Sequence, residues 1–208
     1  MRILIADDHA IVRRGLKEIL LDEFPSAIIG DASDAEELVE KIFQDEWDLV
    51  ISDLTMPGRS GLDALKQIKQ AFPKLPVLIM SIYPEDQYAV RAFRAGASGY
   101  FNKNSIHEEL LKAIDSVRKG RKYITPSVAE KLADALPADG QLKPHQMLSD
   151  REFEVFKLLA SGRTVSEIAQ QLSLSANTVS TYRSRILEKM NLHSNNELMR
   201  YAFEQNLL

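Results

Sequence analysis

The sequence predicts an α/β domain with a doubly wound, five-stranded parallel sheet, followed by a smaller all-α domain. Within residues 1–120 of the 208-residue chain, short β-branched runs alternate with amphipathic stretches, which is typical of a parallel sheet covered by helices on both faces. Beyond Gly120 this strand pattern does not recur, and the remaining periodic segments are helical. We therefore expect the first domain at 1–120, a linker with a short helix at 121–147, and the second domain at 148–208.

The expected elements follow from hydrophobic period and from turn residues. Strands are predicted near 2–6, 27–31, 48–52, 76–80 and 98–101. Helices are predicted near 10–22, 34–45, 61–72, 85–94, 105–118, 126–135, 149–160, 164–172, 176–190 and 194–205. Asp34 is placed to cap one of these helices, and Ser149 with Glu152 fits a capping box at another.

Composition excludes several classes of protein. With 45% hydrophobic and 27% charged residues, the chain is typical of a globular protein, and its apolar runs are too short to cross a bilayer. No leader with a cleavage site precedes the first strand, which favours the cytoplasm. The absence of cysteine excludes thiolate sites, and four histidines without paired spacing argue against zinc. The acidic pI near 5.6 disfavours strong non-specific binding to nucleic acid but leaves specific binding open.

Polar side chains follow four of the predicted strands. Asp7 and Asp8 follow the first strand, Asp53 the third, Ser81 the fourth and Lys103 the fifth. In an open parallel sheet these carboxyl ends converge on one edge, where ligands bind. Three carboxylates there repel one another unless a hard divalent cation lies among them. Acids for Mg²⁺, one lysine and one hydroxyl together indicate a site for a transferable phosphoryl group.

The ordered set of segments 5–9, 52–58, 79–81 and 100–103 resembles the receiver domain of two-component response regulators, over residues 1 to about 120. The resemblance implies a flavodoxin-like strand order and a phosphoryl acceptor, Asp53, that is phosphorylated by a phosphohistidine on a sensor histidine kinase. It also implies that Mg²⁺ is held by Asp8, the Asp53 carboxylate and the main-chain carbonyl of Thr55, with Asp7 acting mainly through water.

The same resemblance assigns roles around Asp53. Lys103 would bond one phosphoryl oxygen, Ser81 would move to bond another, and Tyr100 would follow inward, so that the last two form a bistable switch. Thr55 and Tyr83 would border the path of hydrolytic water and tune the phosphoryl lifetime. We interpret His9 as a loop or first-turn residue and not as a metal ligand.

Other interpretations of the acidic cluster were compared. Any one of these aspartates alone could simply cap the next helix. A flavin site on the same sheet would need a Ser/Thr/Gly-rich first loop, and Asp7-Asp8 would repel its phosphate. A haloacid-dehalogenase-type phosphatase carries an Asp-x-Asp motif after its first strand, where this chain has none.

Residues 148–208 resemble the helix-turn-helix output domain of the NarL/FixJ (LuxR-type) regulators, through segments 148–152, 158–162, 166–170 and 175–190. Residues 173–175 would make the turn, and Val179, Ile186 and Met190 share a buried face. The opposite face would enter the major groove with its N-terminal half. The residues expected on that exposed face are Asn177, Thr178, Ser180, Thr181, Ser184, Arg185 and Glu188.

Contacts to DNA are expected to divide by side-chain type. Short polar residues would meet base edges, whereas Tyr182, Arg185 and Lys189 are better placed for phosphates. The role of Arg183 is left open. In the last helix Leu198, Tyr201 and Ala202 form one stripe, which either packs inside the domain or contacts a second copy.

The sequence thus predicts a cytoplasmic DNA-binding response regulator that is not an enzyme and has no membrane association. It would be phosphorylated on Asp53, form a homodimer when phosphorylated, and bind double-stranded DNA to regulate transcription, with RNA polymerase as a further candidate partner. Two rivals stay open. One is a regulator whose helical domain docks a protein partner, and the other is an enzyme that turns over phosphate esters.

Overall fold

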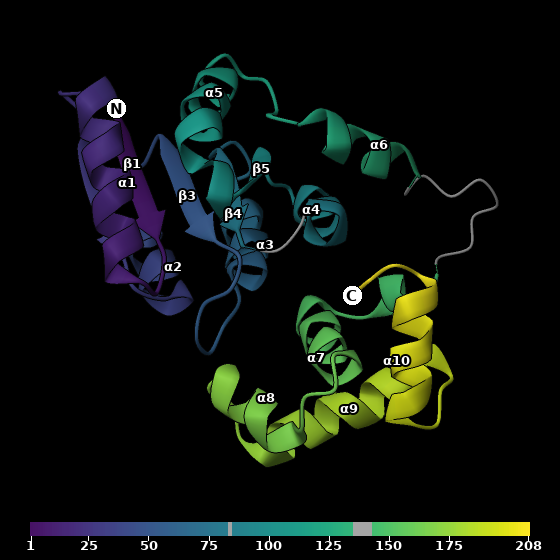
Figure 1. The fold of residues 1–208 in the computed structure, drawn as a ribbon. Helices are drawn as coiled ribbons and strands as arrows, with labels where there is room; N and C mark the ends of the chain where they lie inside the picture. The colour runs from purple at the N-terminus through teal and green to yellow at the C-terminus, as the bar shows by residue number, and fades with distance from the viewer. Residues whose placement is uncertain (83–84, 135–142) are drawn as a thin grey trace. The chain divides into compact units, whose positions relative to one another are not determined.

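The computed structural model describes residues 1–82, 85–134 and 143–208 (Figure 1). The chain divides into two compact units, Met1–Leu136 and Pro137–Leu208. No helix among the described residues is long and apolar enough to span a bilayer.

A single parallel sheet of five strands forms the centre of the first unit. Its strands are β1 (Arg2–Ala6), β2 (Ile28–Ala32), β3 (Leu49–Asp53), β4 (Val77–Ser81) and β5 (Gly99–Asn102). They lie in the order β2-β1-β3-β4-β5, which confirms the predicted flavodoxin-like order. Pairing of Asp53 with Met80 and of Ser81 with Asn102 brings the carboxyl ends of β3, β4 and β5 level with one another. The polar residues at these ends therefore share one edge of the sheet.

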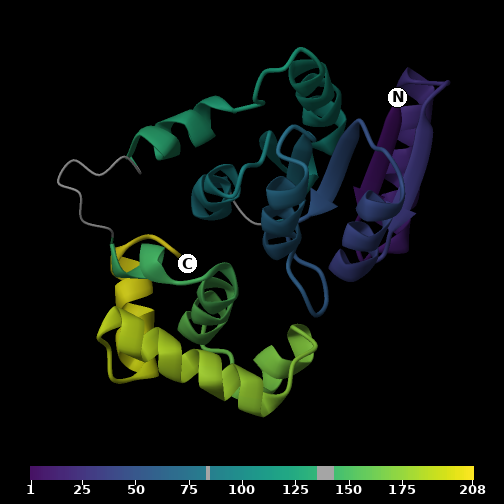
Figure 2. The same ribbon diagram turned by 180° about the vertical axis from the view of Figure 1, so that it is seen from behind.

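Helices cover both faces of this sheet (Figures 1 and 2). They are α1 (Ala10–Glu23), α2 (Ala35–Gln44), α3 (Gly61–Ala71), α4 (Glu85–Arg94) and α5 (Ile106–Arg118), with a 3-10 turn at Lys103–Ser105. Side chains alternate across a strand, so Ile3 and Ile5 of β1 point to one face, where they form a core with Leu16 of α1 and Ile114 of α5. Helices α2 and α4 contact the sheet at β1 and β5, and α3 packs beside α2.

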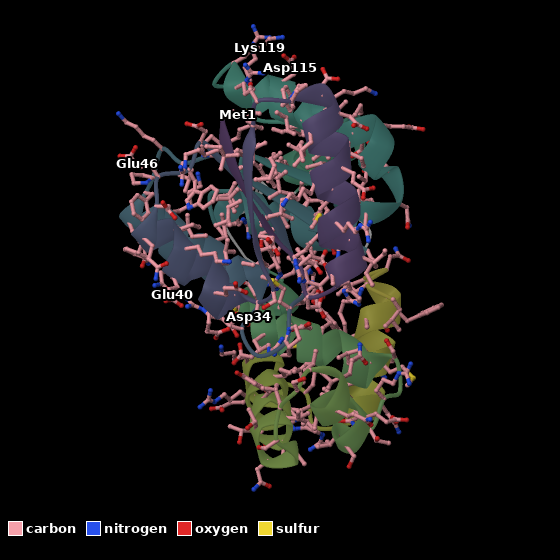
Figure 3. All side chains as sticks on the ribbon, turned by 90° about the vertical axis from the view of Figure 1, so that its left-hand side faces the viewer. Met1, Asp34, Glu40, Glu46, Asp115 and Lys119 are labelled. Carbon is pink, nitrogen blue, oxygen red and sulfur yellow. The ribbon has the colours of Figure 1, made fainter. Side chains whose placement is uncertain are left out.

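Local signals set the helix ends. The side chain of Asp34, labelled in Figure 3, accepts a hydrogen bond from the Glu37 amide and so begins α2 one residue later than the sequence predicted. At the end of α5, Lys119 pairs with Asp115 at 2.6 Å, one helical turn away.

A sixth helix, α6 (Pro126–Asp134), also belongs to the first unit. The sequence placed this segment in the linker, but in the structure α6 packs against α4, and its Val128 is fully buried. The sequence predicted that this helix reaches residue 135, but residues 135–142 lie outside the described part of the chain.

The described part of the second unit, residues 143–208, contains helices and no strand. It contains a 3-10 turn η2 (Pro144–Met147), then α7 (Asp150–Ala160), α8 (Val165–Gln171), α9 (Ala176–Met190) and α10 (Asn195–Glu204). Helix α7 lies against α8, α9 and α10, with Phe153 and Phe156 almost completely buried. Ser149 and Glu152 form the capping box that the sequence predicted at the start of α7.

Candidate functional site

Three strand ends place one lysine between two carboxylates. Asp53 is the last residue of β3, Asp7 directly follows β1, and Lys103 directly follows β5. The Lys103 ammonium donates hydrogen bonds to Asp7 Oδ2 and Asp53 Oδ2, each at 2.7 Å. All three side chains are nearly buried, with exposed fractions of 11% for Lys103, 6% for Asp53 and 0% for Asp7. The structure thus brings together three of the residues that the sequence assigned to the phosphoryl site.

Burial and neighbouring charges act in opposite directions on these groups. Burial raises the pKa of Asp53 to about 6, against the lowering effect of Lys103 and with a further increase from Asp7. Burial also disfavours the charge on Lys103, but Asp53 and Asp7 outweigh it and hold the pKa of Lys103 above its usual value. One lysine therefore does not fully compensate two buried carboxylates.

Asp7 also belongs to a second group of possible metal ligands, beside the Lys103 cluster. Asp7, Asp8 and His9 place ligand atoms within 4.8 Å of one another. Asp8 Oδ1 is buried and accepts no hydrogen bond in the described part of the chain, although His9 Nδ1 lies 2.8 Å away. Buried carboxylate oxygens without enough hydrogen-bond donors are the ligands that a hard divalent cation prefers, so the donor set fits Mg²⁺. His9 is the N-cap residue of α1, just before its first turn, and its side chain is 65% exposed.

The loop that follows Asp53 approaches the sheet closely. The amide of Thr55 donates to Asp53 Oδ1 at 3.3 Å, so one carboxylate oxygen faces this loop and the other faces Lys103. Gly61, the first residue of α3, donates its amide to the carbonyl of Leu54 at 2.9 Å. A Cβ atom at Gly61 would lie 2.0 Å from the carbonyl oxygen of Asp53. Only glycine allows α3 to begin this close to Asp53.

The predicted switch residues occupy buried positions. Ser81 ends β4 and is 1% exposed, and Tyr100 in β5 is fully buried. Tyr100 pairs in register with Ile79, two residues before Ser81. Tyr83, assigned to the path of hydrolytic water, lies outside the described residues.

In the second unit, α8, a turn and α9 form a helix-turn-helix. Ser173 adopts a left-handed backbone conformation with φ of 53°, and the amide of Leu174 donates to the carbonyl of Ala169 at 2.8 Å, which closes the turn. Val179 and Ile186 are fully buried, and Met190 is 5% exposed, which confirms the predicted inner face of α9.

The opposite face of α9 is polar and largely exposed. Asn177, Ser180, Thr181, Ser184, Arg185 and Glu188 are exposed, whereas Thr178 and Tyr182 are half-buried. Two hydroxyls on this face bond to their own helix: Thr181 donates to the carbonyl of Asn177 at 2.9 Å and Ser184 to that of Ser180 at 3.1 Å. These short side chains must rotate away from the helix backbone before they can donate a hydrogen bond to a ligand.

Two contacts of α9 were not anticipated from the sequence. Lys189 donates to Glu152 Oε2 at 2.7 Å, which ties the end of α9 to the start of α7. Arg183, whose role the sequence left open, donates from Nε to Asn195 Oδ1 at 2.7 Å and so ties α9 to α10. Both partners are far away in sequence, and only their polar character gave a signal.

The predicted stripe on α10 is directed into its own domain. Leu198 and Ala202 are fully buried, and Tyr201 meets His145 Nδ1 at 2.9 Å through its hydroxyl. The apolar side chains that α10 exposes are instead Met199, at 42%, and Phe203, at 76%.

A buried acid-lysine cluster at the carboxyl ends of a parallel sheet, joined in one chain to a helix-turn-helix, defines a response regulator of the DNA-binding class. Residues 3–115 match the response regulator receiver domain, and residues 146–202 match the bacterial regulatory proteins of the LuxR family. The chain belongs to the NarL/FixJ (LuxR-type) response regulators, a family of transcription regulators.

Relatives match it along its whole length. The oxygen regulatory protein NreC of Staphylococcus carnosus is 37% identical in sequence. The alignment covers 100% of this chain and 99% of the NreC chain. RcsB of Salmonella enterica serovar Typhimurium, solved on the promoter rprA with the phosphomimetic BeF3-, has a TM-score of 0.58 and 28% identity and covers 97% of both chains. A structure of two RcsB dimers on two parallel DNAs gives a TM-score of 0.60 and 28% identity, with 97% of both chains covered.

Proposed function

We propose that Asp53 accepts a phosphoryl group from a phosphohistidine on a sensor histidine kinase, and that this modification controls binding of the second domain to double-stranded DNA. The proposal rests on the position of Lys103. Its ammonium donates a hydrogen bond of 2.7 Å to each of the nearly buried carboxylates of Asp7 and Asp53. An attacking carboxylate oxygen of Asp53 forms the new O–P bond while the P–N bond to the kinase imidazole breaks. Lys103 then has a phosphoryl oxygen to bond in place of one carboxylate.

Mg²⁺ is the cofactor that the acidic group favours. Asp8, the Asp53 carboxylate and the Thr55 carbonyl would hold it, and Asp7 would act mainly through water. When bound, the ion neutralises charge on the phosphoryl oxygens and holds Asp53 ionised. The raised pKa of Asp53 and the Asp8 Oδ1 atom, which accepts no hydrogen bond in the described part of the chain, both favour binding of a cation at this place.

The DNA interface is proposed on the exposed face of α9. Asn177, Thr178, Ser180, Thr181 and Ser184 would approach base edges in the major groove, and Tyr182, Arg185 and Lys189 would bond phosphates. The buried inner face of α9 supports this orientation, because it leaves only the polar face for a ligand.

Dimerisation and transcription complete the proposal. The RcsB dimers solved on DNA support a homodimer of this chain, and Met199 with Phe203 is the exposed apolar surface of α10 that such a dimer would cover. RNA polymerase would be contacted by the DNA-bound dimer.

The experiment treats the full chain with acetyl phosphate and Mg²⁺ and measures its intact mass and its DNA binding. We expect one added phosphoryl group, lost in Asp53→Asn and retained in the matched Asp34→Asn, whose carboxylate only caps α2. Genomic fragments from the source organism should be retained by the phosphorylated protein in a salt-dependent manner. An equal yield of label in Asp53→Asn excludes the acceptor assignment, and turnover of phosphate esters without a stable adduct would favour the enzyme rival.

A further inference from the structure

The segment after α5 is attached to the free edge of the sheet. Gly120 turns the chain with φ of 71°, and the amide of Tyr123 donates to the carbonyl of Ser98 at 2.8 Å. Tyr123 also forms a parallel bridge with Gly99, the first residue of the edge strand β5. A Cβ atom at Gly99 would lie 2.7 Å from Leu78 Cδ2 and 3.0 Å from Tyr123 Cβ. Glycine at this position therefore permits the segment to approach β5.

Helix α6 begins immediately after this attachment and is seated on α4. Thr125 accepts the amide of Val128 on its hydroxyl at 3.3 Å, and Pro126 opens the helix. Val128 is fully buried and Leu132 is half-buried, whereas the other α6 side chains that the structure describes are exposed. In both ribbon views α6 runs beside α4 (Figures 1 and 2).

The packing contact between α6 and α4 is small. Lys122 lies 5.5 Å from the centre of the Phe93 ring of α4, but it also repels the half-buried Lys69. Burial first, and the positive charge of Lys122 second, lower the pKa of Lys69. A helix of nine residues is marginal in water on its own. Helix α6 therefore exists because it is seated on α4, and leaving α4 would unfold it.

Helix α4 connects this seat to the phosphoryl site. In the chain, α4 begins at Glu85, four positions after Ser81. It also packs against β5, the strand that contains Tyr100. Ser81 is 1% exposed and Tyr100 is fully buried, so a movement of Ser81 toward a phosphoryl group has to be accommodated by the elements that pack around these two residues. Close-packed interiors transmit such a displacement to the neighbouring element, which here is α4.

We propose that α6 is a phosphorylation-controlled strap, seated on α4 when Asp53 is unmodified and released from α4 when Asp53 is phosphorylated. The inference rests on the proposed phosphorylation of Asp53 and adds a structural change that this phosphorylation would cause. As a helix the nine residues of α6 span about 14 Å, and as an extended chain they span up to about 30 Å. Release would lengthen the connection between the two domains and give the second domain a wider range of positions.

The test measures hydrogen exchange of residues 126–134 in the full chain, with and without acetyl phosphate and Mg²⁺, beside the intact mass of the same samples. We expect the α6 amides to exchange at least tenfold faster in the phosphorylated protein. Unchanged or slower exchange with one phosphoryl group on Asp53 overturns the strap and leaves the proposed function standing. Absence of that mass shift in wild type overturns both.

A matched pair of variants separates docking from helix propensity. Val128→Ala should show fast exchange in α6 without phosphorylation and little further change with it, although alanine is a better helix former than valine. Ala133→Ser, at an exposed position of the same helix, should respond to phosphorylation as wild type does. Slow exchange in unmodified Val128→Ala would contradict the assigned seat on α4.

Discussion

Lys189 donates a hydrogen bond of 2.7 Å to Glu152, across 37 positions of sequence. The carboxylate is 4% exposed and the lysine 43% exposed, so the bond lies at the rim of the second domain's core. Partial burial would raise the pKa of Glu152, but hydrogen bonds from Lys189 and Ser149 together lower it. Lys189 thus has a structural partner besides the phosphate that we propose for it.

Lys189→Ala should accordingly have two effects. The salt slope of DNA binding should fall by about one unit, as for any lost phosphate contact. Removing the partner of a nearly buried carboxylate should also destabilise the start of α7 by about 1 kcal/mol. Hydrogen exchange of α7 measures the second effect. Arg185→Ala is the matched control, since Arg185 is exposed and should lower the salt slope without changing α7 exchange.

Asp53→Asn should stabilise the first domain in the absence of metal at neutral pH. The folded pKa of Asp53, about 6, exceeds its usual 3.8, so the folded state holds this proton more tightly than the unfolded state. The free energy of unfolding of wild type therefore falls as pH rises from about 4 to about 6 and stays lower above that.

Urea unfolding in EDTA, followed by fluorescence of Trp47, the only tryptophan, measures this difference. The asparagine variant should gain on the order of 3 kcal/mol at pH 7.5 and nothing at pH 4. A wild type as stable as the variant at pH 7.5 would mean that the Lys103 pairing outweighs the burial of Asp53.

Mg²⁺ should raise the melting temperature of the first domain. An ion that binds only the folded state adds about 1 kcal/mol at ten times its Kd. The shift, read from Trp47 fluorescence, should disappear in Asp8→Asn and persist in Asp34→Asn. Equal shifts in both variants would place the ion elsewhere.

Ser81→Ala should separate phosphorylation from its consequences. The variant keeps Asp53, Asp7 and Lys103, so intact mass should still show one added phosphoryl group. It lacks the hydroxyl that would draw the end of β4 toward that group, so dimerisation, measured by light scattering, should be weak. Full dimerisation of the phosphorylated variant would remove Ser81 from the switch.

Thr181→Ala and Ser184→Ala should change which sequences are preferred, each by about 1 kcal/mol at its own base position. Losing a base contact costs roughly 1–3 kcal/mol, and the low end is expected because both hydroxyls must first leave a carbonyl of their own helix. Selection of operator variants measures the preference. If both variants kept the wild-type preference while Lys189→Ala altered it, our orientation of α9 would be wrong.

The sequence predicted those features that depend on local pattern. Strand period and the polar residue after each strand were sufficient to place Asp7, Asp53 and Lys103 at one edge, because parallel topology makes strand ends converge. The buried face of α9 followed in the same way from its helical period.

Contacts between distant elements were beyond the sequence pattern. The partners of Arg183 and Lys189 depend on how α9 crosses α10 and α7, which no local period encodes. The same holds for α6: the sequence predicted a helix near 126–135, but not that it would pack against α4.

The close approach of Gly61 to the Asp53 backbone has a consequence for genetics. A side chain at position 61 would clash with the main-chain carbonyl of Asp53, the proposed acceptor. It would not remove any charged group of the site. A screen for signalling-dead alleles should therefore recover substitutions of Gly61 alongside those of Asp53. Such alleles would carry a complete set of acidic residues, yet the main chain at their acceptor would be displaced.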